Sequence, residues 1–172
     1  WAYSFIFIKD KVSPKDIPFK LNRAQRRVLN KLEKLRKAGK PIKFILLKAR
    51  QWGGSTLVQI YMLWIMLVHR RNWNTVICGD VETQSRNVRA MITKALNKYP
   101  SYLLGETVKF TPFEGSSKNK VIQNTNCVVS IGSFQKPDTL RSGDISGAHL
   151  TEIGLWRATP GKKPEDLIQS IS

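Results

Sequence analysis

The chain has 172 residues, 41% of them hydrophobic, which is the length of about one domain with enough apolar residues to bury a core. Its 29 lysines and arginines outnumber 12 acidic residues, for a formal net charge of +17. This surplus exceeds what solubility needs, so we expect a polyanionic partner, DNA or RNA first. The two histidines stand apart, which excludes zinc-ligand spacing, and the apolar run at residues 56–68 is too short to span a bilayer comfortably.

The chain begins with an aromatic and β-branched segment, residues 1–8, which predicts an edge strand or a docking arm. This segment lacks the basic region and cleavage site of a signal peptide. Residues 9–18 carry two prolines and mixed charge and indicate a connector. Residues 21–37 follow a helical pattern with one apolar face and many cations elsewhere, and Gly39 and Pro41 end that helix. A basic helix of this kind is usually a solvated face, although it also suits phosphate contact.

Residues 44–56 have the order of elements that is typical of a phosphate-binding loop. Four apolar residues, 44–47, predict a buried strand; a loop with two glycines follows, and a helix is expected from Ser55 to about His69. A strand, a glycine loop and a helix N-terminus aim backbone N–H groups at one anion.

The loop departs from the usual G-x-x-x-x-G-K-[ST] pattern. If Ser55 is the metal-binding hydroxyl, Gly53 is the second glycine, Gly54 holds the lysine position and Lys48 holds that of the first glycine. The lysine has therefore moved to the other end of the loop, where Arg50 is a second cation for the same phosphates. The alternative is a plain glycine turn with solvated cations.

The rest of the chain alternates strands with helices, which predicts an α/β fold with a parallel sheet covered on both faces. Cys78 and Cys127 lie in apolar strand-like runs and are expected to be buried thiols, which suits a reducing cytoplasm. In chain order we expect a strand at residues 75–78, a helix at 81–98, an irregular stretch at 103–119, a hairpin of 120–123 with 127–132, a polar loop at 133–144, an apolar run at 145–150 and a helix at 164–171.

A nucleotide-hydrolysing loop also needs a carboxylate at the end of a neighbouring apolar strand, where it orients water or holds Mg²⁺. Residues 146–152 fit that description and end in Thr151 and Glu152. The usual pair is Asp-Glu, so the neutral Thr151 can hold only a metal-bound water by hydrogen bonding. The alternative is a strand-end glutamate without a special role.

Taken together, these motifs resemble the large terminase subunit, the DNA-packaging motor ATPase of tailed phages. Residues 48–56, Lys-Ala-Arg-Gln-Trp-Gly-Gly-Ser-Thr, look like that family's deviant Walker A, with its lysine at the start of the loop. Residues 140–156 look like its Walker B segment, except that Ser142 separates the expected Arg-Gly pair. Residues 19–25 resemble its adenine-binding motif, and the resemblance covers about residues 19–156.

The resemblance implies a P-loop NTPase fold of the RecA/ASCE type, a parallel sheet flanked by helices, truncated on its C-terminal side. It implies an N-terminal arm at residues 1–18 and an ATPase domain at 19–172. The implied function is ATP hydrolysis, with ATP and Mg²⁺, coupled to translocation of double-stranded DNA into a procapsid. The implied partners are the portal protein and the small terminase subunit, in a homo-oligomeric ring in the host cytoplasm, without a membrane.

The resemblance also implies a role for each site residue. Lys48 would neutralise the β- and γ-phosphates, and Glu152 would be the catalytic carboxylate. The amide of Gln25 would read the adenine edge; the alternative is a polar residue on an exposed helix face. Either Arg50, in cis, or Arg141, on a neighbouring subunit's ATP, would stabilise transition-state charge. The remaining implied residues are Gln51, Gly53, Gly54, Ser55 and Thr56 for the nucleotide, and Ser55 and Thr151 for the metal.

Two other functions stay open: another DNA-translocating or helicase-like ATPase, and a basic nucleic-acid-binding domain without strong catalysis. Only twenty residues follow Glu152, and neither the coupling motif nor the nuclease domain of the family is visible in them. We therefore interpret the chain as a fragment of a longer protein and expect the fragment alone to hydrolyse ATP poorly.

Overall fold

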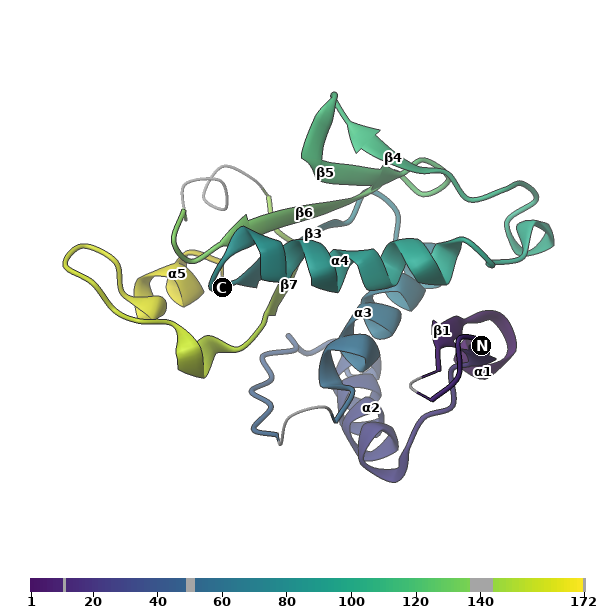
Figure 1. The fold of residues 1–172 in the computed structure, drawn as a ribbon, viewed down its shortest axis with the longest axis horizontal. Coiled ribbons are helices and arrows are strands. Elements are labelled where there is room, and N and C mark those ends of the chain that lie inside the picture. The colour runs from purple at the N-terminus through teal and green to yellow at the C-terminus, as the bar shows by residue number, and fades with distance from the viewer. Residues whose placement is uncertain (11, 49–51, 137–143, 172) are drawn as a thin grey trace.

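The computed structural model describes residues 1–10, 12–48, 52–136 and 144–171. Within them, a five-stranded sheet is covered on one face by two long helices and on the other by the C-terminal helix (Figure 1). This arrangement confirms the predicted α/β class. The helices on the first face are α3 (Gly54–Trp64) and α4 (Glu82–Leu96), and the C-terminal helix is α5 (Pro164–Ile171).

The sheet is mixed, with a parallel half and an antiparallel half, in the order β4-β5-β6-β3-β7. The central strand β3 pairs in parallel with β6 on one side and with β7 on the other. The β4–β5 and β5–β6 pairs are antiparallel, which confirms the predicted hairpin. The strands are β3 (Asn74–Gly79), β4 (Phe110–Phe113), β5 (Ser116–Ile122), β6 (Cys127–Ser133) and β7 (Gly147–Leu150).

The main core lies between the sheet and helices α3 and α4. Leu63 and Met66 are fully buried there against sheet residues such as Ile77 and Ile131. Helix α3 is apolar nearly all round, so it runs through the centre of the domain. It continues as a π-helical turn, Ile65–His69, to the end of the predicted helix. No helix of the described residues is long and apolar enough to cross a membrane.

Helix α2 (Arg23–Lys37) lies at the periphery and begins at a capping box. The side chain of Asn22 accepts a hydrogen bond from the Gln25 backbone N–H, and the side chain of Gln25 accepts one from the Asn22 backbone N–H. The helix ends at Lys37, and Gly39 follows with a positive φ of 65°, as its sequence predicts. The described residues also form two 3-10 turns, Ser101–Leu103 and Ile153–Leu155.

The N-terminal segment packs on α4 as a short helix α1 (Ala2–Phe5) and a hairpin of β1 (Phe7–Lys9) with β2 (Asp16–Pro18). Ile6 is fully buried in the main core. The Asp16 carboxylate contacts the ammonium groups of Lys94 and Lys98 at 2.8 and 3.0 Å, and hydrogen bonds from them lower the pKa of Asp16. The interpretation of residues 9–18 as a plain connector is therefore wrong, because they contain β2.

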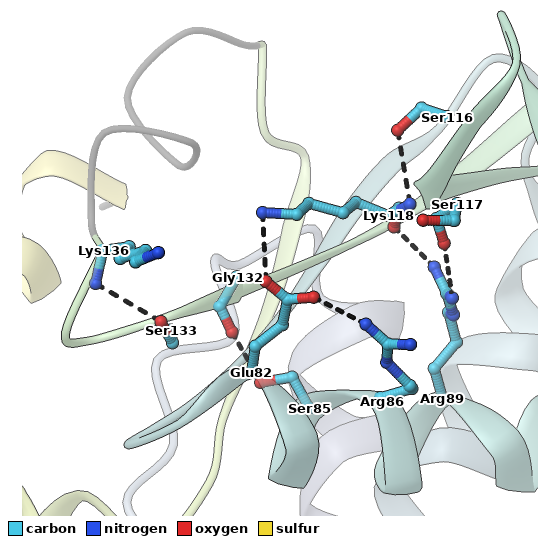
Figure 2. Close-up of polar contacts among 10 residues, drawn as sticks. All are labelled: Glu82, Ser85, Arg86, Arg89, Ser116, Ser117, Lys118, Gly132, Ser133 and Lys136. Carbon is cyan, nitrogen blue, oxygen red and sulfur yellow. Dashed lines mark hydrogen bonds and ion pairs between the residues drawn. The ribbon is translucent and has the colours of Figure 1, made fainter.

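Ser85 fixes the N-terminal half of α4 to the ends of two neighbouring strands. Its hydroxyl accepts a hydrogen bond from the Gly79 N–H at 2.7 Å. It also donates one to the Gly132 carbonyl at 2.6 Å (Figure 2). Because Ser85 is fully buried, these two bonds hold α4 at a defined height above the ends of β3 and β6.

A charged cluster fixes the same half of α4 to β5 (Figure 2). The buried guanidinium of Arg89 donates to the carbonyls of Ser117 and Lys118. Glu82 pairs with the Lys118 ammonium at 3.0 Å and with Arg86 at 2.8 Å, and hydrogen bonds from these two cations lower the pKa of Glu82. The first two turns of α4 are therefore tied to the sheet at several points.

Two predicted segments differ in the structure. Residues 44–47 are not a buried strand: residues 41–48 have no regular structure, and Ile45 and Leu47 are 95% and 99% exposed. An apolar run indicates burial but does not identify a partner for the backbone, and this segment joins no strand of the described sheet. The stretch 103–119 is not wholly irregular, since β4 and the start of β5 lie within it.

Candidate functional site

The three parallel strands β6, β3 and β7 end side by side at one edge of the sheet. Asp80 follows β3, Phe134 follows β6, and Thr151 and Glu152 follow β7. Backbone bonds continue the pairing there, from the Thr151 N–H to the Cys78 carbonyl at 2.8 Å. Ligands of open α/β sheets bind outside the carboxyl ends of the strands, so this edge is the candidate site.

Residues 52–54, the described end of the glycine loop, lead into α3 through two residues without side chains. Gly53 is the N-cap of α3, with a left-handed φ of 80° that favours glycine. A Cβ on Gly54 would lie 2.9 Å from Cδ of Lys48 and 3.1 Å from the ring of Trp52. The aliphatic stem of Lys48 therefore crosses Gly54 directly, and a side chain at residue 54 would displace it.

Gln25 of α2 holds the loop from the other side. Its Nε2 donates to the Gly53 carbonyl at 3.0 Å, while its Oε1 serves the capping box. Gln25 is only 5% exposed, so the alternative of a polar residue on an exposed helix face is wrong. The role of Gln25 toward adenine stays a prediction; in the structure, both ends of its amide are engaged with the protein.

His149 of β7 faces helix α3. Its Nδ1 is 2.6 Å from Nε2 of Gln59 in α3, and Oε1 of Gln59 has no hydrogen-bond partner among the described residues. Burial of the ring, and secondarily the charge of Lys48, lowers the pKa of His149 from 6.5 to about 4. The imidazole is therefore neutral at pH 7, which suits a site that also holds a lysine.

This lowered pKa predicts a loss of stability in mild acid. Below pH 6.5 the imidazole of His149 becomes protonated in the unfolded chain, whereas in the folded chain it stays neutral down to about pH 4. The free energy of unfolding should therefore fall as pH decreases from 6.5 to 5, by about 2 kcal/mol from this group. Urea denaturation of wild type and His149→Asn at several pH values measures it, and the variant should lose most of the slope.

The matched control is His69→Asn, which removes the only other histidine of the chain. His69 is exposed, but partial burial of its ring also lowers its pKa, so its substitution should reduce the pH slope, and by less than His149→Asn does. A slope that persists in His149→Asn, or that disappears in His69→Asn, would contradict the assignment.

Glu152 follows β7 in a left-handed conformation, with φ of 57° and ψ of 37°. Nonglycine residues rarely adopt this backbone, and it occurs most often where the surrounding structure enforces it. The exposed carboxylate of Glu152 accepts a hydrogen bond from Nε2 of Gln84 in α4 at 3.1 Å. Oε1 of Gln84 accepts in turn from the Asp80 N–H at 3.0 Å.

Lys48 and Glu152 both contact the helices that cover one face of the sheet. His149 is aligned with Ile77 in the β3–β7 pair, so its ring lies on the face that packs against α3 and α4. Lys48 lies over the start of α3, and its charge helps to lower the pKa of His149. Glu152 accepts a hydrogen bond from Gln84 of α4. If Lys48 and Glu152 belong to one site, both must lie on the same face of the sheet. The contacts of both residues are to the helices on the face covered by α3 and α4.

The remaining predicted residues lie as follows. Ser55 is the second residue of α3, and Thr151 is buried at the end of β7. The hydroxyl of Thr56 is 3.8 Å from the sulfur of Met91, so it faces α4. Three predicted residues lie outside the described part of the chain: Arg50, Gln51 and Arg141.

Gln84 and Asp80 are functional candidates that the sequence interpretation missed. Asp80 carried a usable signal, because an acidic residue directly after a buried strand and a glycine is placed at the carboxyl edge of the sheet. Gln84 carried none, since it lies in a helix 68 positions before the glutamate that it contacts.

This sheet, its covering helices and its carboxyl edge define an α/β domain with a terminase-like fold. Among solved structures, the chain is similar to the large terminase of bacteriophage HK97, with a TM-score of 0.68 and 22% sequence identity. The match covers 99% of this chain and 34% of the HK97 protein, so this chain spans about a third of the length of the HK97 protein. No protein-family model matches the sequence, and the curated proteins contain no match either.

Proposed function

We propose that this chain is the ATP-hydrolysing part of a terminase-like DNA-packaging motor. The observation that carries the proposal is the placement of Lys48 and Glu152. The lysine crosses a bare glycine at the start of α3, the glutamate ends β7, and both contact the helices on the same face of the sheet. A cation and a carboxylate placed in this way are the two protein groups that phosphoryl transfer to water needs.

Lys48 and the start of α3 would bind the triphosphate. The first N–H groups of a helix lack internal partners and favour an anion, and the missing side chain of Gly54 leaves room for the Lys48 stem beside them. The Lys48 ammonium would add a charge-assisted bond from above the same glycine.

Mg²⁺ would be held by the hydroxyl oxygen of Ser55 and by a metal-bound water hydrogen-bonded to Thr151, because Mg²⁺ prefers oxygen ligands and takes only one or two from the protein, together with waters and phosphate oxygens. When bound, it would neutralise charge on the phosphates. Glu152 would accept a hydrogen bond from the attacking water and orient it, which only an ionised or strongly polar side chain can do.

The DNA part of the proposal has support from charge. Helix α2 exposes six cations for which the described residues provide no ion-pair partner, while Arg36 pairs with Glu33 at 2.7 Å. Contacts of this kind neutralise phosphates without reading sequence, as a translocating motor requires. The proposed motor would act as a homo-oligomeric ring in the host cytoplasm. Its partners would be double-stranded DNA, a portal protein and a small terminase subunit.

A basic nucleic-acid-binding domain without strong catalysis is the second candidate. The observation that favours it is Thr151, a neutral residue at the position where a carboxylate would hold the metal. In that case the chain would bind DNA with the same salt dependence, and ATP turnover would not depend on Lys48 or Glu152.

ATP turnover by wild type and Lys48→Ala separates the two candidates. Loss of one charge-assisted phosphate contact, about 1.5–3 kcal/mol, should weaken ATP binding about 10- to 100-fold. Lys43→Ala is the matched control, since it removes an exposed lysine just upstream. Equal ATP binding and turnover in wild type and both variants would overturn the enzymatic proposal and favour the second candidate.

A further inference from the structure

The side-chain amide of Gln84 makes two hydrogen bonds, one as acceptor and one as donor. Its Oε1 accepts from the backbone N–H of Asp80 at 3.0 Å, and its Nε2 donates to Oε2 of Glu152 at 3.1 Å. The first bond fixes which end of the amide faces Asp80, so the donor end must face Glu152. An amide held in this way presents N–H, and not oxygen, to the carboxylate.

The surroundings hold Gln84 rigidly. A Cβ on Gly79 would lie 2.9 Å from Oε1 and 3.0 Å from Cβ of Gln84, so the side chain packs directly on the bare backbone of that glycine. The next residue, Ser85, is fully buried and bonded to the ends of β3 and β6. The charged cluster of Glu82 and Arg89 ties the same turns of α4 to β5 (Figure 2).

Glu152, by contrast, is exposed and follows the last strand of the sheet in a strained conformation. Apart from Gln84, the structure gives its carboxylate no hydrogen-bond partner among the described residues. The direction of the carboxylate therefore depends on a residue from a different element, and misplacement of a catalytic group by 1 Å can cost about 10²-fold in rate.

We propose that Gln84 is the positioning residue of the catalytic carboxylate. It holds Oε2 of Glu152 with its amide N–H and leaves Oε1 to meet the attacking water. Gln84 itself touches neither substrate nor water. This inference rests on the proposed function, because it assigns to Gln84 a role in the same hydrolysis.

Two substitutions at residue 84 separate positioning from a structural role. Gln84→Glu keeps the length of the side chain and the acceptor for the Asp80 N–H, but it replaces the donor by a second carboxylate. Gln84→Ala removes both bonds. Because partners of this kind typically contribute 10- to 100-fold, kcat should fall about tenfold or more in both variants, with KM for ATP changed less than about twofold.

Two further readouts respond only if Gln84 acts through Glu152. First, Gln84→Glu should regain turnover relative to wild type as pH falls from 8 to 6, because two adjacent carboxylates share a proton and the protonated one donates again. Second, neither substitution should lower turnover further in a Glu152→Gln background. The matched controls are Gln123→Glu and Gln123→Ala, at an exposed glutamine with one hydrogen bond, to Thr111.

The outcomes are distinguishable. Turnover that depends on Lys48 and Glu152 but is unchanged by Gln84→Glu overturns the positioning role alone. Gln84 variants that lower turnover by the same factor with and without Glu152 overturn it as well, because the loss then arises elsewhere. Wild-type turnover that is independent of Lys48 and Glu152 overturns the proposed function, and the role of Gln84 with it.

Discussion

Replacement of Glu152 by glutamine is expected to lower the kcat of ATP hydrolysis about 10²–10⁴-fold, the range of a lost general acid–base or water-orienting group. The substitution keeps the size of the side chain and its hydrogen bond with Gln84, so the loss reflects the missing negative charge. ATP binding should change little, because the carboxylate follows β7 and the proposed phosphate-binding groups lie at the start of α3. Single-turnover hydrolysis and equilibrium binding of an ATP analogue measure the two effects separately.

Glu114→Gln is the matched control for this experiment. Glu114 is also an exposed glutamate with a left-handed backbone, φ of 49°, but it lies in the turn between β4 and β5. It should keep wild-type turnover. A Glu152→Gln variant that hydrolyses ATP as fast as the wild type would remove the glutamate from the mechanism.

A triple substitution on α2, Arg23→Gln, Arg27→Gln and Lys34→Gln, is expected to weaken binding of double-stranded DNA about 10²-fold at 0.1 M salt. These three cations share one side of the helix by their spacing, and none has an ion-pair partner among the described residues. If each meets one phosphate, the slope of log K against log [salt] should become shallower by about 3. A salt titration of binding to a duplex of random sequence measures that slope.

The control removes the same charge from other surfaces, through Lys9→Gln, Lys109→Gln and Lys163→Gln, three exposed lysines outside α2. It should change the slope much less. If both triple variants shift the slope equally, DNA binds through the general charge of the protein and α2 is not the contact surface. If neither affects DNA binding, α2 is not a DNA-contacting surface.

Helices and the hairpin could be predicted because their patterns are local. The apolar spacing and basic residues of α2, the breakers at Gly39 and Pro41, and the polar turn at residues 124–126 all act within a few positions. The start of α3 at Gly54 was predictable for the same reason, since glycines and hydroxyl residues precede an apolar run. Both cysteines are buried and free, as their apolar neighbours predict.

The errors have two causes: pairing over long distance, and strands too short to leave a sequence pattern. Residues 44–47 have the composition of a buried strand, yet they join no described strand, and β2 and β4 were missed because each has only three or four residues. Likewise the contact of Gln25 with Gly53 joins residues 28 positions apart. No local pattern predicts such contacts, because they depend on how α2 packs beside α3.

The backbone at Glu152 places stability and activity in conflict. A left-handed conformation costs a side-chain-bearing residue about 1 kcal/mol or more relative to glycine. Selection for thermal resistance alone would therefore favour replacing this glutamate by glycine, whereas selection for hydrolysis would retain it. The end of β7 is thus a place where evolution toward a more robust protein and evolution toward a faster one lead to different residues.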